Sequence, residues 1–136
     1  RGSTTFFANW LRETFQEAGI SVDVKKAAEL ENFDYDLFIV GSPIYYEKPL
    51  KSIVNFLSAN EEILQTKKLA VFVVCMARLF GKTTKKYIKN RYLKSLEKKV
   101  SGTLLGRIAF RGWLKKPNYN EKKNVENWAK YLIDAL

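Results

Sequence analysis

Apolar residues recur at helical spacing near both ends of the chain. Phe7, Leu11 and Phe15 lie four residues apart, which predicts a helix over residues 4 to 18. Gly19 follows directly, and a glycine at this position can end a helix in the left-handed conformation. The last helix is predicted from a fuller repeat, formed by Val125, Trp128, Ala129, Leu132, Ile133 and Leu136.

Two further helices lie between these. Pro49 is suited to the first position of a helix over residues 49 to 58, in which apolar residues repeat at intervals of three and four. Residues 83 to 99 predict a strongly basic helix with Ile88, Tyr92 and Leu96 facing inward.

Four strands are predicted between the helices, at residues 20 to 24, 36 to 40, 69 to 76 and 104 to 110. The second and third are almost continuously apolar, which is typical of parallel strands covered on both faces. Alternating helices and buried strands predict a single doubly wound α/β domain over residues 1 to 136, with helices on both faces of the sheet.

Composition narrows the chemistry. The chain has no histidine and one cysteine, which excludes Ser-His-Asp and Cys-His catalysis, zinc clusters and disulfides within the chain. Cys75 lies inside an apolar run and is predicted to be a buried structural thiol. Redox or group-transfer chemistry would therefore need a cofactor. No apolar run is long enough to span a bilayer and no signal peptide is recognisable, so a cytoplasmic protein is expected.

Charge is unevenly distributed. Residues 1 to 77 hold 8 Lys and Arg against 10 Asp and Glu, whereas residues 78 to 136 hold 16 against 4, a net charge of +12. The basic half favours an anionic partner. Charge alone does not decide whether this partner is nucleic acid, an anionic membrane, or an acidic protein or substrate.

Loops after strands are where ligands settle in such folds. GSPIYY, residues 41 to 46, combines a permissive glycine with adjacent tyrosines, and either holds a flat heteroaromatic ligand or caps the core. RGSTT, residues 1 to 5, begins a helix and either binds a phosphate or provides an N-cap. In residues 76 to 87, Gly81 precedes a helix. This segment is either a loop that packs over a ligand or an ordinary helix start.

Together, GSTT at a helix start, DYDLFIVGSPIYY followed by a helix, and KKLAVFVVCMA resemble the flavodoxin family across the whole chain. Within it, ARLFGKTTKKY and GRIAFRG look most like the menaquinone-dependent protoporphyrinogen oxidase group. The resemblance implies a flavodoxin-like sheet of order 2-1-3-4-5, FMN as the cofactor, and an oxidoreductase or electron-transfer function.

The same resemblance assigns the cofactor site and leaves the catalytic and metal-binding residues unassigned. The FMN phosphate would be bound by Gly2, Ser3, Thr4 and Thr5. One side of the isoalloxazine would be lined by Ser42, Pro43, Ile44, Tyr45 and Tyr46, and the other side by Ala77, Arg78, Leu79, Phe80 and Gly81.

Two features of the chain depart from the family pattern, one in its fold and one in its charge. The strand that precedes the phosphate loop is not visible, so we expect about 10 residues to be missing or supplied by another segment. The basic charge disfavours a simple carrier and favours a redox partner or small molecule such as a porphyrin or quinone, with peripheral contact to an anionic membrane. The alternative is a flavin-free binding module that uses its basic C-terminal half; nucleic acid is the less favoured partner.

Overall fold

The computed structural model describes residues 2–45, 48–76, 91, 93–113, 116–117 and 119–136. Along the chain its elements are α1 (Gly2–Glu17), η1 (Ala27–Glu29), β1 (Leu37–Tyr45), β2 (Lys48–Pro49), α2 (Lys51–Ala59), α3 (Glu61–Leu64), β3 (Lys68–Met76), α5 (Lys94–Glu97), β4 (Thr103–Gly112) and α6 (Asn120–Ala135).

The described strands form one sheet in the order β2-β1-β3-β4. β1, β3 and β4 are parallel, and the register pairs Val40 with Val71 and Val71 with Arg107. β2 is a short antiparallel addition to the carboxyl end of β1. The parallel core confirms the predicted α/β class, because each of these strands is separated from the next by a helical crossover.

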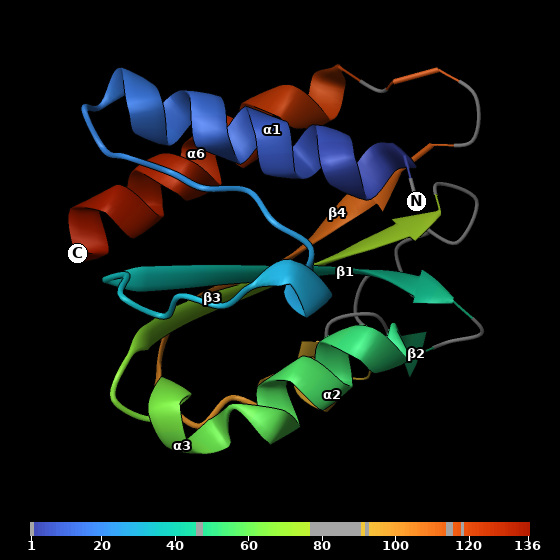
Figure 1. Ribbon diagram of the computed structural model, residues 1–136. Coiled ribbons are helices and arrows are strands. Elements are labelled where there is room, and N and C mark those ends of the chain that lie inside the picture. The colour runs from blue at the N-terminus through green and yellow to red at the C-terminus, as the bar shows by residue number, and fades with distance from the viewer. Residues whose placement is uncertain (1, 46–47, 77–90, 92, 114–115, 118) are drawn as a thin grey trace.

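Helices cover both faces of the sheet (Figure 1). α1 and α6 pack on one face, where side chains of Ala70, Phe72 and Val74 point into the core. α2, α3 and α5 pack on the other, against Leu69, Val71, Val73 and Cys75 from the same strand. Because successive strand residues face opposite ways, β3 serves two cores at once, and its continuously apolar sequence follows from that position.

The end of α1 follows the prediction closely. Gly19 has a φ of 81°, the left-handed conformation. The N–H of Gly19 donates to the carbonyl of Gln16, and that of Ile20 donates to the carbonyl of Phe15. These are the two bonds of a Schellman motif, which satisfies carbonyls that a helix end leaves without partners.

Three sequence predictions need correction. Residues 20 to 24 form no strand. Strand β1 does not end at Val40 but continues through Gly41, Ser42 and Pro43 to Tyr45, so that Pro49 lies in β2 and α2 begins at Lys51. Backbone pairing with β3 and β2 carries the strand through the predicted break.

The last two helices match the prediction in part. α6 buries Val125, Trp128, Ala129 and Leu132, but Leu136 lies beyond its last turn and is 45% exposed, which corrects the prediction that this residue faces the core. Of the predicted helix over 83 to 99, the structure describes α5, with Leu96 buried. Ile88 and Tyr92 lie outside the described residues.

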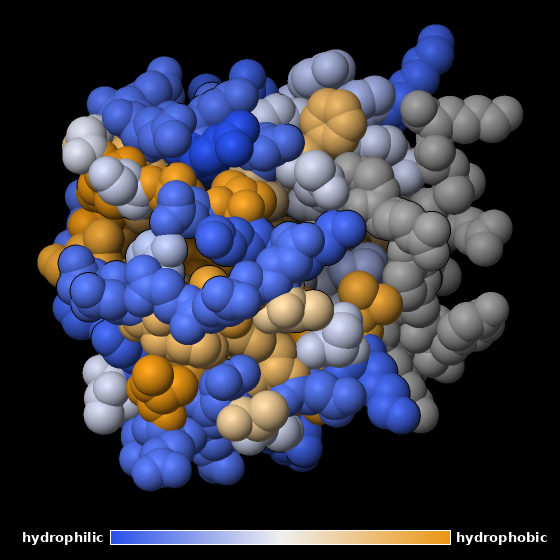
Figure 2. Space-filling view, in the orientation of Figure 1, coloured by the Kyte–Doolittle hydropathy of each residue, from blue (hydrophilic) through white to orange (hydrophobic). Residues whose placement is uncertain are grey.

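Figure 2 shows a mostly hydrophilic face, with apolar surface visible on both sides of the polar band that crosses the front of the molecule. None of the helices in the described ranges combines the length and hydropathy needed to cross a membrane.

Candidate functional site

The beginning of α1 lies at the carboxyl end of the sheet. Figure 1 shows the N-terminus on the same side as the arrowheads of β1 and β3. Contacts support this placement: Trp113, the residue directly after β4, lies 5.4 Å from Phe6 and 5.3 Å from Phe7 between ring centroids. The first turns of α1 therefore border the crevice in which open α/β sheets bind their ligands.

The first turn of α1 carries an unusual feature. The Thr4 hydroxyl oxygen is buried, and no hydrogen-bond partner for it is present in the described part of the chain. Buried polar groups normally have partners, and an anion bound at this position could provide one for the Thr4 hydroxyl. The first turn also holds no acidic side chain that would repel an anion.

The neighbours of Thr4 are described in part. The helix begins at Gly2, which leaves the first main-chain N–H groups without helical acceptors. Thr5 is exposed. The Ser3 side chain lies outside the described part of the structure.

The predicted ring-binding segment is more buried than expected. Ser42 has no exposed surface; its hydroxyl donates to the Pro43 carbonyl and accepts from the Leu50 N–H, both at 2.8 Å. Ile44 packs in the core between the sheet and α2, and Pro43 is buried as well. The side chains of these three residues are buried in the fold. Only their main-chain groups could contact a ligand.

The remaining predicted ligand residues cannot be placed. The Tyr45 side chain and Tyr46 lie outside the described residues, as do Ala77, Arg78, Leu79, Phe80 and Gly81. Their roles stay predictions.

Cys75 is fully buried, and desolvation raises the pKa of its thiol to about 12. A thiol with so high a pKa is neutral near neutral pH and is a poor nucleophile. Across the described ranges, no group of three or more His, Cys, Asp and Glu side chains could hold a metal ion.

An aromatic cluster beside the first turn of α1 was not predicted from the sequence. Trp113 contacts Phe6, Phe7 and Trp10, and Tyr119 lies 5.9 Å from Trp10 between ring centroids. Phe6 is 38% exposed and Tyr119 is 63% exposed. The signal available in the sequence was an aromatic residue a few positions after a predicted strand, the same signal that drew attention to the tyrosines of GSPIYY.

These features define a doubly wound α/β domain in which the first turn of a helix, with its free main-chain N–H groups, lies at the carboxyl end of the sheet. The family model for the flavodoxin domain matches residues 1–128, so the chain belongs to the flavodoxin domain family. No curated protein sequence matches the chain.

Solved structures show the same fold. A rubredoxin oxygen:oxidoreductase from Desulfovibrio gigas is 16% identical, with a TM-score of 0.73; the match covers 98% of this chain but 33% of that one. A flavodoxin from Streptococcus pneumoniae is 13% identical, with a TM-score of 0.71 and coverage of 99% and 92%. A flavoprotein from Lactobacillus acidophilus, solved in complex with FMN, is 15% identical, with a TM-score of 0.52 and coverage of 90% of both chains.

Proposed function

We propose that this chain binds FMN and transfers electrons through it to a redox partner. The observation that carries the proposal is the buried Thr4 hydroxyl without a partner, located at the start of α1 in a flavodoxin domain. A phosphate at this place would accept a hydrogen bond from that hydroxyl and from the free N–H groups of the first turn. The donor set therefore fits the phosphate of FMN.

Bound FMN supplies the chemistry of one-electron or hydride transfer, which side chains cannot perform. This chain's part is to bind and orient the cofactor. Gly2, Ser3, Thr4 and Thr5 would hold the phosphate, while the segments 42–46 and 77–81 are proposed to flank the ring. The absence of histidine is no obstacle, because such transfer needs no side-chain acid or base from the protein.

A finer proposal concerns the partner. The net charge of +12 in residues 78–136 favours an acidic redox protein or a polycarboxylate such as a porphyrin, as in the protoporphyrinogen oxidase group that the sequence resembles. We propose a cytoplasmic protein with peripheral contact to anionic membranes on the same basis. Oxidation of protoporphyrinogen by the FMN-loaded protein without oxygen, with a quinone as the electron acceptor, tests the porphyrin proposal and is followed as porphyrin fluorescence; no turnover would eliminate it.

The test of FMN binding uses a single hydroxyl. Thr4→Val keeps the shape of the side chain and removes the group that lacks a partner. We expect the dissociation constant for FMN, measured by quenching of flavin fluorescence, to rise roughly tenfold, because a hydrogen bond to a charged group is lost. Stability without FMN should not fall, since an unsatisfied buried group is removed.

The matched control is Thr66→Val, an exposed threonine whose hydroxyl donates to the Ile63 carbonyl far from α1. This variant should bind FMN as the parent does. An unchanged constant in Thr4→Val would place the phosphate elsewhere, and a parent chain that takes up no FMN at micromolar concentration would refute the proposal.

A further inference from the structure

Aromatic rings reach the surface where α1 and α6 begin, at the carboxyl end of the sheet. The two helices pack side by side, and α6 starts shortly after the end of β4 (Figure 1). Between ring centroids, Trp10 lies 5.8 Å from Phe6, 5.7 Å from Trp113 and 5.9 Å from Tyr119. Trp10 is buried, whereas Phe6 and Tyr119 are exposed and Trp113 is half-buried. The cluster is therefore rooted in the core and presents rings to solvent.

Lysines lie beside these rings. Lys116 is exposed, three residues after Trp113 and three before Tyr119. The Tyr119 carbonyl accepts from the Lys122 N–H at 3.1 Å, so the helical turn begins at Tyr119 and places Lys122 and Lys123 on its side of α6. Among the described residues none of these lysines forms an ion pair. The aromatic–basic surface, as we call it, consists of Phe6, Trp113, Lys116, Tyr119, Lys122 and Lys123.

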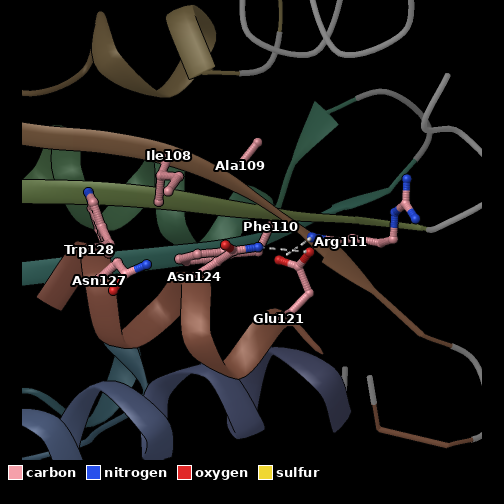
Figure 3. Close-up of a pocket in the computed structure, with 8 residues that line it drawn as sticks. All are labelled: Ile108, Ala109, Phe110, Arg111, Glu121, Asn124, Asn127 and Trp128. Carbon is pink, nitrogen blue, oxygen red and sulfur yellow. Dashed lines mark hydrogen bonds between the residues drawn. The ribbon is translucent and has the colours of Figure 1, made fainter. Parts of the chain in front are cut away.

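The acidic residue in the first turn of α6 does not neutralise this surface. Glu121 turns toward β4, where its carboxylate accepts from the Arg111 N–H at 3.4 Å and from Asn124 Nδ2 at 3.3 Å (Figure 3). Residues 111 to 123 hold five Lys and Arg against this one Glu. The connection from β4 to α6 is thus strongly basic.

The next acidic residues of the two helices are set back from the surface. Glu13, the first in α1, follows Phe6 by seven residues, and Glu126 follows Tyr119 by seven. Seven residues of helix are about 10 Å long, and both helices run away from the carboxyl end of the sheet. Positive charge and exposed rings therefore share one end of the molecule.

This combination fits a lipid surface better than a nucleic acid. Tryptophan and tyrosine rings settle at the headgroup level of bilayers, and nearby lysines attract anionic lipids. Bases, by contrast, stack on an open ring face. Phe6 meets Trp10 and Trp113 at interplanar angles of 64° and 77°, so these rings pack edge to face against one another. Their exposed parts offer apolar area and no ready stacking platform.

We propose that the aromatic–basic surface rests on an anionic lipid bilayer, with its rings among the headgroups and its lysines at the lipid phosphates. This inference rests on the peripheral membrane contact of the proposed function and assigns it a surface. The surface adjoins the first turn of α1, where the FMN phosphate is proposed to bind. The flavin crevice then opens close to the bilayer, where an electron carrier dissolved in lipid, such as a quinone, can reach it.

Cosedimentation with lipid vesicles tests the contact. The vesicles are phosphatidylcholine with about 30% phosphatidylglycerol, and pure phosphatidylcholine vesicles are the reference. We expect the chain to bind the anionic vesicles, to bind them more weakly as salt is raised, and to bind the neutral vesicles weakly at all salt concentrations.

Two pairs of lysines provide a matched comparison. Lys116→Gln with Lys123→Gln should weaken binding to the anionic vesicles about 25-fold, because two cations leave the proposed contact. Lys98→Gln with Lys99→Gln removes the same charge from exposed positions between α5 and β4, at the amino end of the sheet. This control should change binding by about twofold at most, since charges far from the lipid are screened.

Two tyrosines of α6 separate the rings from the charge. Tyr119→Ser should weaken vesicle binding about fivefold, because apolar area is lost from the interface. Tyr131→Ser removes a ring of similar exposure twelve residues further along the helix and should leave binding unchanged. Urea unfolding of both variants shows whether either change disturbs the fold.

The outcomes separate this inference from the proposed function. Equal losses in the two lysine pairs, or in the two tyrosine variants, would mean that this surface is not the contact. A loss in the lysine pair without one in Tyr119→Ser would indicate an acidic protein or a nucleic acid and overturn the bilayer. Failure of the parent chain to bind anionic vesicles would refute the membrane contact as a whole. FMN uptake, measured on the same samples, tests cofactor binding independently.

Discussion

The two faces of the sheet are packed with different kinds of side chain. Of the buried residues that the structure describes, the core against α1 and α6 contains six aromatic rings, from Phe7, Trp10, Phe15, Phe72, Phe110 and Trp128. The core against α2, α3 and α5 contains one, from Phe38, among leucine, valine and isoleucine. Both cores share β3, which contributes one of the aromatic side chains, Phe72, so the rest of the difference comes from the helices and the other strands.

Large rings need space that the backbone must leave free. A Cβ on Gly41 would collide with the Phe72 ring. Among the described residues of the aliphatic core, no glycine makes room for an aromatic ring in this way. The aromatic face is therefore expected to be sensitive to the exact shape of each side chain, whereas the aliphatic face should tolerate more adjustment.

The largest expected effect comes from removing one ring. Phe110 is 1% exposed, stacks on Phe7 at 4.9 Å and meets Phe72 and Trp128 edge to face. Phe110→Ala should lower the free energy of unfolding by about 4 kcal/mol, because rigid neighbouring rings cannot fill the cavity. Leu57→Ala, at an equally buried site on the aliphatic face, should cost about 3 kcal/mol.

Urea unfolding of both variants measures this difference, provided that the slopes of the transitions agree. A greater loss in Leu57→Ala would contradict the idea that the aromatic face adjusts less readily.

Adding a methyl group should also damage the aromatic face. Gly41→Ala should destabilise the protein by about 2 kcal/mol, because the Phe72 ring must move away from the new Cβ. Phe72→Leu in the same chain should recover part of this loss, which a double-mutant cycle would detect as coupling between the two positions. Two additive losses would show that the ring is not the cause. Gly106→Ala is the control and should cost less, since its closest contact is the end of a leucine side chain.

The sequence allowed much of the fold to be predicted where local pattern and tertiary position agree. β3 was predicted almost residue for residue, because a strand buried on both faces is apolar throughout. α6 was predicted from its repeat, and the end of α1 from Gly19. Each of these signals lies within a short stretch of chain.

The failures in strand prediction depend on distant residues. In the described residues, β1 pairs on the side away from β3 with β2 alone, and residues 20–24 have no strand beside which to extend. The Gly-Ser-Pro segment looked like a break, but pairing with residues 72 to 74 of β3 keeps it in the strand.

The candidate site was predicted in the same uneven way. Thr4 was selected from the resemblance to flavodoxins, and its buried hydroxyl without a partner is the observation on which the proposed phosphate site rests. Ser42 was also selected, yet its hydroxyl contacts the main chain of Pro43 and Leu50.

The smallest predicted effect sharpens the comparison from the aliphatic face. Cys75 is fully buried there, and burial raises the pKa of its thiol from 9.0 to about 12. Between these values the unfolded chain loses the thiol proton while the folded chain keeps it, so stability falls as the pH rises. At pH 10 the loss relative to pH 7 should be about 1 kcal/mol, and Cys75→Ala should lack this component. Urea unfolding of both proteins at the two pH values measures it, and an equal loss in both would mean that water reaches this thiol and that the aliphatic face is less tightly closed than its burial indicates.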